Sequence, residues 1–174
     1  MSERPLIVRL ALDQGAFDWF DDLRRAWFPP ERNQVPAHLT LFHALPGAEL
    51  EPITETLRAL AAKTPPMTLR VTGPRSLGNG VAYRMEAPAL GALHAKLSAA
   101  FAPWLTRQDR QPLRPHITVQ NKASPDAARD LLERLQAEFE AFDVLGEGVS
   151  LWRYLGGPWE PIGRAAFTGA PQAR

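Results

Sequence analysis

Two short segments of the chain place a histidine and a threonine two residues apart within an apolar run. The first reads AHLTL and the second reads PHITV, and their histidines are 116 − 38 = 78 positions apart. Side chains in a β-strand point alternately to opposite faces, so His38 and Thr40 share one face, as His116 and Thr118 do. The aliphatic residues between them can anchor each strand in a core. If the two strands face each other, they form a cleft that carries two imidazoles and two hydroxyls.

This set of groups fits hydrolysis of a phosphodiester, such as a 2′,3′-cyclic phosphate, without a metal ion. In-line attack on phosphorus needs a base for the proton of water and an acid for the departing ribose oxygen. Histidine, with an ordinary pKa of about 6.5, can serve as either near neutral pH. Threonine hydroxyls can donate to the non-bridging phosphate oxygens. We therefore predict that His38 and His116 form an acid–base pair and that Thr40 and Thr118 bind phosphate, with the order of acid and base left open.

Each histidine alone is equally well explained as a hydrogen-bonded structural residue at a strand end. The joint occurrence of both histidines with both threonines favours catalysis. The alternative function is a non-catalytic RNA or nucleotide binding module that retains the cleft, and the filled motif positions argue against it. By strand alternation His43 should point away from Thr40, so a packing or surface role is favoured. His94 lies in a predicted helix without HExxH spacing, and no metal site is predicted.

Two residues that follow the motifs are candidates for substrate binding. Phe42 alternates onto the face of His38 and Thr40, where it can line the cleft and stack a base, although a core position is also open. Gln120 shares its face with Thr118 and can read the edge of a base or be solvated.

Two further candidates lie near the cleft but outside the motifs. Arg114 precedes the second motif and forms a basic loop with Arg107 and Arg110, which either grips phosphates beyond the scissile one or is simply solvated. Trp159 lies beside the GGP turn, where it can stack on a base or pack within the last hairpin.

Hydrophobic periodicity and turn residues around the motifs predict the order β-α-β-α-β-β-α-β-α-β-β. Strands are predicted at 5–13, around 38–43, twice within 67–86, at 116–122, at 142–157 and at 159–169. Helices are predicted at about 15–28, 49–63, 88–104 and 125–142. The GP at 73–74 and the GNG at 78–80 are predicted turns.

A histidine strand, a helix and two further β segments occur twice in this order, from residue 38 and again from residue 116. The repetition predicts an α+β fold of two lobes related by a pseudo-two-fold axis. Each lobe is expected to contain an antiparallel or mixed sheet with helices outside, and the cleft is expected between the lobes. We expect one domain, 1–174, with motif strands near 38–41 and 116–119.

The amino-acid composition excludes several kinds of chemistry and bears on RNA binding and on the cellular location. The chain has no cysteine, which excludes disulfides, thiol nucleophiles and cysteine-ligated zinc. Its 20 basic and 19 acidic residues give a net charge of +1, so attraction to RNA must come from a local patch. The apolar run near the N-terminus is too short for a secretion signal, and no run of about 18 apolar residues occurs. We expect a cytoplasmic monomer with no membrane contact.

The paired motifs, their separation, the RPHITV form of the second motif and the tail LWRYLGGPWEPIGRAAF resemble the 2H phosphoesterase superfamily, in particular its 2′-5′ RNA ligase-like branch. The resemblance covers most of the chain. It implies a bilobal α+β fold, a cofactor-free and metal-independent site between the lobes, and action on 2′,3′-cyclic phosphate or 2′-5′ linkages of RNA or nucleotides. It also implies the roles given above for the four motif residues. The chain departs from the family at FHALPG, where His43 replaces the usual aromatic residue.

Overall fold

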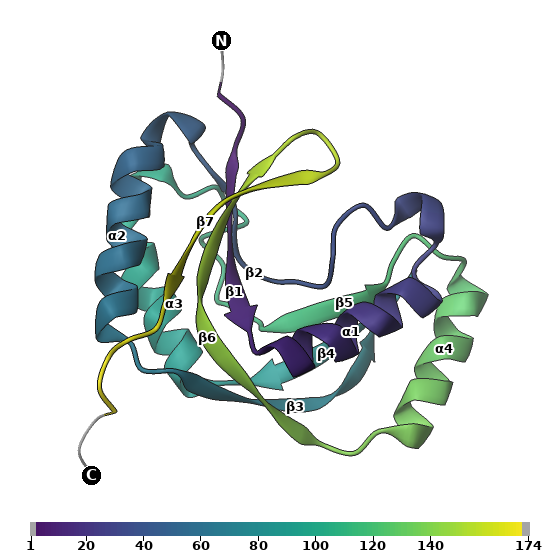
Figure 1. The fold of residues 1–174 in the computed structure, drawn as a ribbon. Coiled ribbons are helices and arrows are strands. Elements are labelled where there is room, and N and C mark those ends of the chain that lie inside the picture. The colour runs from purple at the N-terminus through teal and green to yellow at the C-terminus, as the bar shows by residue number, and fades with distance from the viewer. Residues whose placement is uncertain (1–2, 172–174) are drawn as a thin grey trace.

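The computed structural model describes residues 3–171 and consists of a strongly curved antiparallel sheet covered by α-helices (Figure 1). The first two and last three residues of the expected 1–174 domain lie outside the described residues. The α+β class and the predicted order of elements are confirmed. In chain order the helices and strands are β1 (Leu6–Leu12), α1 (Gln14–Trp27), β2 (Leu39–Leu45), α2 (Leu50–Lys63), β3 (Met67–Ser76), β4 (Val81–Glu86), α3 (Pro88–Ala100), β5 (His116–Gln120), α4 (Pro125–Glu138), β6 (Phe142–Tyr154) and β7 (Trp159–Ala166).

The two lobes share one continuous sheet instead of the two sheets predicted from the sequence. The strand order is β2-β1-β6-β3-β4-β5, and β7 pairs with β6. Strand β6 is 13 residues long and joins the lobes. Its first part pairs with β3 over Phe142–Gly146, and its later part pairs with β7 over Gly148–Tyr154. A strand of this length can bend through both lobes, so the sheet curls without breaking.

The internal repeat of the sequence corresponds to a repeat of the fold. The chain runs through β-α-β-α-β once from β1 to β3 and again from β4 to β6. Exchanging β1 with β4, β2 with β5 and β3 with β6 leaves the strand order unchanged. The two motif strands, β2 and β5, are therefore equivalent and lie at opposite ends of the six-strand path.

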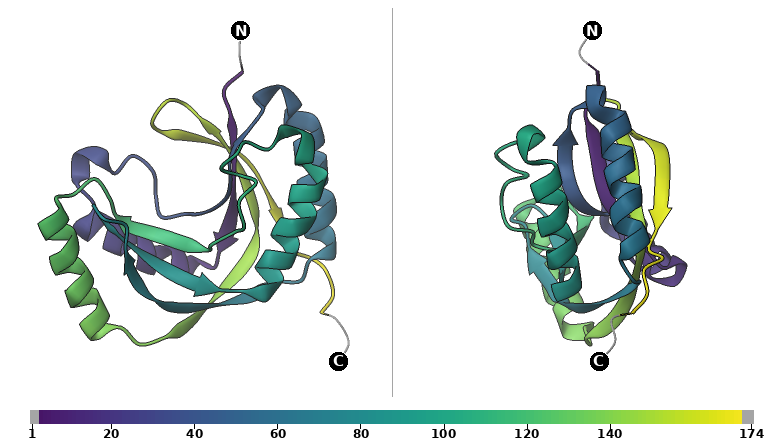
Figure 2. Two further views of the ribbon diagram at one scale, coloured as in Figure 1. Left: turned by 180° about the vertical axis from the view of Figure 1, so that it is seen from behind. Right: turned by 90° about the vertical axis from the view of Figure 1, so that its left-hand side faces the viewer.

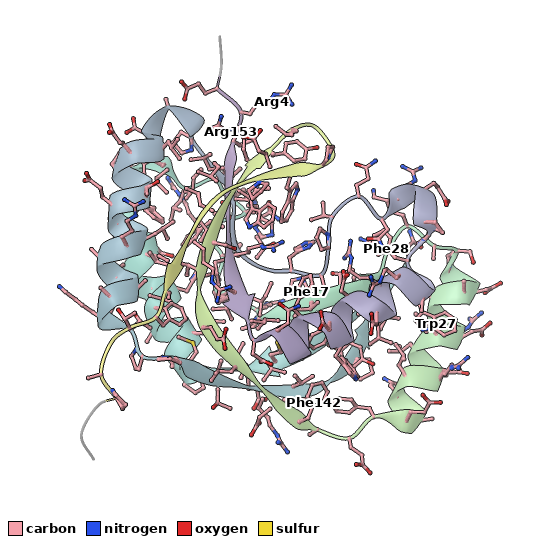
Figure 3. The ribbon with its side chains drawn as sticks, in the orientation of Figure 1. Arg4, Phe17, Trp27, Phe28, Phe142 and Arg153 are labelled. Atoms are coloured by element: carbon pink, nitrogen blue, oxygen red, sulfur yellow. The ribbon has the colours of Figure 1, made fainter. Side chains whose placement is uncertain are left out.

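Helices pack in pairs on the outside of the sheet (Figure 2). Helices α2 and α3 lie side by side over one lobe, where α2 contacts β6 and β7. Helices α1 and α4 cover the other lobe and contact β5 and β3. Phe20 of α1 is fully buried there, with ring centroids 5.7 Å from Tyr83 and 6.3 Å from Phe142. Trp27 points from the end of α1 toward α4, where the Arg134 guanidinium lies 5.0 Å from its ring centroid (Figure 3).

Several predicted elements are shorter in the structure, among them α4, which ends at Glu138 instead of 142, and two further differences have a clear physical cause. Gly73 and Pro74 lie within β3 instead of forming a turn, because the pairing with β4 shifts register between Val71 and Gly73. Gly73 has a φ of +146°, a conformation that glycine adopts without a steric penalty. Helix α3 ends at Ala100 and not at 104, because a proline at 103 removes a backbone donor and a short 3₁₀ turn follows.

Within residues 3–171, no helix combines the length and the apolar character that crossing a membrane requires.

Candidate active site

The two motif strands contact each other across the concave side of the curved sheet (Figure 1). His38 directly precedes β2, and His116 is the first residue of β5. Thr40 of the first motif and His116 of the second line the same surface depression, which has a volume of about 430 Å³. Thr118 is half-buried on the same face of β5 as His116. The fold therefore places the two motifs side by side although they are far apart in the sequence.

The two motif imidazoles are held by the same kind of backbone contact. Nδ1 of His38 lies 2.8 Å from the carbonyl oxygen of Pro36, and Nδ1 of His116 lies 2.8 Å from the carbonyl oxygen of Arg114. A carbonyl oxygen only accepts hydrogen bonds, so Nδ1 carries the proton in each contact. Nε2 is left to exchange a proton with a ligand while the ring keeps its orientation.

His38 has apolar and cationic surroundings. Its ring centroid lies 4.5 Å from that of Trp159. Burial lowers the pKa of His38 to about 4, and the backbone carbonyl contact only partly opposes this shift. Positive charges lower the same pKa further, and they belong to Arg24, Arg9 and His116. His38 is therefore neutral at pH 7, which is the state of a general base.

Helix α1 positions both motifs. Asp21 Oδ1 accepts a hydrogen bond of 2.9 Å from the backbone N–H of Ala37, the residue before His38. Arg24 Nη1 donates a hydrogen bond of 2.9 Å to the carbonyl oxygen of Thr118. Arg24 is only 4% exposed, and burial lowers its pKa to about 10 while the charge of Asp21 opposes the shift. Adjacent turns of one helix thus fix the start of β2 and the middle of β5.

Both motif strands contain a β-bulge directly after the threonine. In the first lobe, Arg9 pairs with Thr40 and the preceding Val8 pairs with Phe42, so Leu41 is the extra residue. In the second lobe, Ala82 pairs with Thr118 and the preceding Val81 pairs with Gln120, so Val119 is the extra residue. One extra residue in a strand reverses the alternation of all side chains that follow it. The regular alternation that the sequence analysis assumes therefore fails beyond Leu41 and Val119.

Phe42 and Gln120 lie in the protein interior, so the prediction that they line the cleft is wrong. Phe42 is fully buried, and its ring stacks on His94 with centroids 4.8 Å apart and packs edge-on against Phe101 at 5.4 Å. Gln120 is 4% exposed. His94, which lies on helix α3 as predicted, is buried beside Phe42, and burial lowers its pKa. Among residues 3–171, no three His, Asp or Glu side chains converge as metal ligands would.

The same bulge turns His43 toward the cleft, contrary to the prediction that it points away from Thr40. His43 lines the depression with Thr40 and His116. Its Nδ1 lies 2.9 Å from Asp109 Oδ1, and the backbone N–H groups of His43 and Ala44 donate to the same carboxylate at 2.8–3.0 Å. Burial raises the pKa of Asp109, but these hydrogen bonds outweigh it and hold the pKa below its ordinary value. This carboxylate anchors the loop before β5 to β2.

The arginines near the second motif differ in their positions. Arg114 is exposed and lines the depression that contains His116. Arg107 and Arg110 are exposed but do not line it. Arg84, which the sequence analysis did not consider, is exposed and pairs with His116 across the β4–β5 ladder. Of the predicted basic loop, only Arg114 is close enough to contact a ligand at His116.

Trp159 lies against His38 instead of standing free beside the hairpin turn. Its ring centroid is 4.5 Å from that of His38 and 6.5 Å from that of Trp152. The indole is half-buried and contributes to the burial of the His38 imidazole.

Two partly or fully buried arginines, Arg9 and Arg24, were absent from the sequence-based candidates. Arg9 is the one charged residue in β1, and its position on the face of Thr40 follows from their pairing. Arg24 lies four residues after Phe20 and seven after Phe17, so helical periodicity places all three on one face of α1, and Phe20 and Arg24 are buried. The signal that points to both residues is a charge at a position where the hydrophobic pattern calls for an apolar side chain.

Comparisons with known proteins agree with this geometry. The sequence profile of the 2′-5′ RNA ligase superfamily matches residues 12–158. A Bacillus cytotoxicus protein that carries the name of a phosphoesterase is 34% identical over 119 residues, which are 64% of this chain and 67% of that protein. The crystal structure of TT0787 from Thermus thermophilus has a TM-score of 0.66 at 19% identity and covers 95% of this chain and 98% of its own.

Escherichia coli LigT complexed with 3′-AMP has a TM-score of 0.61 at 23% identity and covers 95% of this chain and 99% of its own. At this identity the two solved structures establish the two-lobed fold. The chain belongs to the 2′-5′ RNA ligase superfamily, in agreement with the resemblance of its paired motifs to the 2′-5′ RNA ligase-like branch of the 2H phosphoesterases. Its class of activity is that of a phosphoesterase.

Proposed function

We propose that the chain is a metal-independent phosphoesterase that opens 2′,3′-cyclic phosphate or 2′-5′ phosphodiester bonds of RNA ends or nucleotides, with His38 and His116 as the acid–base pair. The observation that carries the proposal is the matched pair of 2.8 Å Nδ1 contacts, which leave both Nε2 atoms available. The complexes of LigT with 3′-AMP, ATP and NADP+ support a nucleotide as the ligand. Because both motifs belong to one chain, we also propose that a monomer is active.

The surroundings of the two histidines support different roles for them. Neutral His38 takes a proton from water on Nε2 as the water oxygen bonds to phosphorus. The bond between phosphorus and the departing ribose oxygen breaks, and that oxygen receives the Nε2 proton of protonated His116. A phosphomonoester and a free ribose hydroxyl result, and the two histidines have exchanged protonation states. Water then carries the proton from His38 back to His116.

In this proposal the threonines and the cationic side chains bind the negatively charged phosphoryl group and its neighbours. The hydroxyls of Thr40 and Thr118 donate to its non-bridging oxygens, as expected from their position beside the histidines. Arg114 lies in the depression next to His116 and is proposed to bind a phosphate of the flanking nucleotide. Trp159 covers one side of His38 and is proposed to contact the ribose or base on that side.

The proposal is tested by incubating the purified chain with adenosine 2′,3′-cyclic phosphate and, separately, with 2′-5′-linked diadenylate, and following phosphorus by NMR. We expect a monophosphate product from at least one substrate. Binding of these nucleotides without turnover of either would contradict the proposal and favour the non-catalytic binding module.

A further inference from the structure

Arg9 lies on the concave face beside the first motif although it belongs to neither motif. In β1 it pairs with Thr40 on one side and with Ser150 of β6 on the other. Residues paired across an antiparallel ladder point to the same face, so the Arg9 side chain lies on the face of the motif threonine. Its charge also acts on His38, the residue two positions before Thr40.

Within the described part of the chain, the guanidinium of Arg9 has a hydrogen-bond acceptor for its Nε and none for its Nη1. Its Nε donates a hydrogen bond of 3.3 Å to Ser150 Oγ, which also accepts one of 3.0 Å from Trp152 Nε1. The guanidinium carbon lies 3.9 Å from the ring centroid of Trp152. Nη1 is buried and has no acceptor among residues 3–171, and none of the ion pairs in that part of the chain includes Arg9. A buried cation without an anion is unfavourable unless a ligand supplies the missing charge.

The fold itself does not require an arginine at this position. The pseudo-two-fold axis relates Arg9 to Ala82, because Ala82 is the residue paired with Thr118 in the second lobe. Ala82 is fully buried, so the equivalent site packs well with a methyl group. An arginine therefore occupies this position only in the lobe of His38, and the equivalent position in the other lobe is an alanine. This difference indicates that Arg9 serves to bind a ligand and not to pack the sheet.

A cavity of about 460 Å³ adjoins Arg9 and His38, and its wall includes Ser150, Trp152 and Arg164. No aspartate or glutamate lines it, so its field favours an anion. We propose that Arg9 is a substrate-binding residue whose guanidinium donates a hydrogen bond to a non-bridging oxygen of the phosphoryl group between His38 and His116. The proposal rests on the proposed function, because that function places a phosphoryl group between the histidines.

Arg9 then has two effects on the reaction. It neutralises charge that develops on the phosphoryl oxygens, at a site already oriented by Ser150 and Trp152. Its charge also adds to the burial that lowers the pKa of the neighbouring His38, so that the base is neutral before substrate binds.

The test compares Arg9→Gln, which removes the charge, with Arg9→Lys, which keeps it. For Arg9→Gln we expect kcat/KM on adenosine 2′,3′-cyclic phosphate to fall about 10²- to 10³-fold, the loss typical of removing one oxyanion donor. The acid limb of the pH–rate profile should move to higher pH, because the positive charge that lowers the pKa of His38 is gone. Arg9→Lys should recover part of the rate and return the acid limb to its original pH.

A binding measurement separates this proposal from the proposed function. Titration of inorganic phosphate and of adenosine 2′-monophosphate by calorimetry needs no turnover, and Arg9→Gln should weaken both by about 10- to 100-fold, as expected for a hydrogen bond to a charged group. Arg129→Gln, at the exposed surface of α4, is the matched control and should bind both as the unmodified chain does. Arg9→Met, which keeps the side-chain stem on Trp152, replaces Arg9→Gln if the glutamine variant does not fold.

Arg9 variants that fold and bind both anions as tightly as the unmodified chain would overturn the assignment of Arg9, even if His38→Ala and His116→Ala abolish turnover. Conversely, the unmodified chain could show no turnover while its anion binding still depends on Arg9. This result would contradict the proposed function and would leave Arg9 as an anion-binding residue.

Discussion

The two motif histidines have the same backbone contact and different surroundings. His38 packs against Trp159 and lies near two arginines, whereas His116 is exposed at the first position of β5. An internal repeat supplies two similar residues, and the asymmetric environment can give them different protonation states. This division of labour is what acid–base catalysis with two imidazoles requires.

At the residue scale, replacing either histidine tests the pair. We expect His38→Ala and His116→Ala each to lower kcat by about 10²- to 10⁴-fold, because each loses one proton-transfer group. Thermal unfolding should show that both variants remain folded. Lys96→Ala, an exposed substitution on α3, serves as the control. A variant of either histidine that retains the full rate would remove that residue from the mechanism.

The pH dependence follows from the lowered pKa of His38. The base is lost when His38 is protonated, so the rate should persist as pH falls from 7 to about 5 and decline near 4, where the folded-state pKa lies. An unfolded chain protonates this residue near its ordinary pKa of about 6.5, so acidification from there toward 4 should also lower the free energy of unfolding. Chemical denaturation at several pH values, with His38→Gln for comparison, measures this component. An acid limb at pH 6.5 would contradict the assignment.

At the scale of elements, side chains that are not part of the motifs position the motif strands. Helix α1 binds the chain before β2 through Asp21 and the edge of β5 through Arg24. The carboxylate of Asp109 connects the loop before β5 to the bulged part of β2 through His43 and Ala44. The Asp21 and Asp109 contacts link the two lobes, and the Arg24 contact fixes α1 on β5, so the relative position of the motifs depends on these polar groups.

Asp109→Ala should destabilise the fold, because two backbone N–H groups of β2 lose their acceptor in a buried site. We expect the free energy of unfolding to fall by about 3 kcal/mol, the magnitude for hydrogen bonds to a charged group, and Asp109→Asn to have a smaller effect because it retains one acceptor oxygen. Urea denaturation measures both variants. Equal stability of Asp109→Ala and the unmodified chain would show that these contacts do not hold the loop.

At the scale of the whole molecule, the curl of a single sheet creates the site. The motif strands are the farthest apart in strand order, yet they contact each other because the sheet bends through β6. The helices pack outside the curved sheet (Figure 1) and leave the concave face to the motifs, Arg9, Trp152 and Trp159. A binding surface formed in this way draws on both halves of the chain.

The proposed mechanism uses two imidazoles for both proton transfers, so activity should not depend on a divalent ion. We expect kcat/KM on adenosine 2′,3′-cyclic phosphate to stay within about twofold after dialysis against EDTA, since no metal-bound water is needed as the nucleophile. Loss of activity that zinc or manganese restores would instead indicate catalysis by a metal site of histidines and carboxylates.

The sequence by itself determined the order of elements, the repeat and the four motif positions. Hydrophobic periodicity reports local structure, and the two-residue spacing of His38 and Thr40 survives because both residues precede the bulge. The resemblance of the motifs to a known superfamily predicted the fold and the class of activity.

Only the tertiary structure decided which neighbours share the cleft. The bulges bury Phe42 and Gln120 and bring His43 to the surface depression, and a bulge depends on strand pairing that periodicity does not report. Arg9 and Arg24 reach the site because strands and a helix distant in sequence fold against the motifs. The sheet is continuous because β6 is long enough to pair in both lobes, and this pairing is set by contacts between segments far apart in the chain.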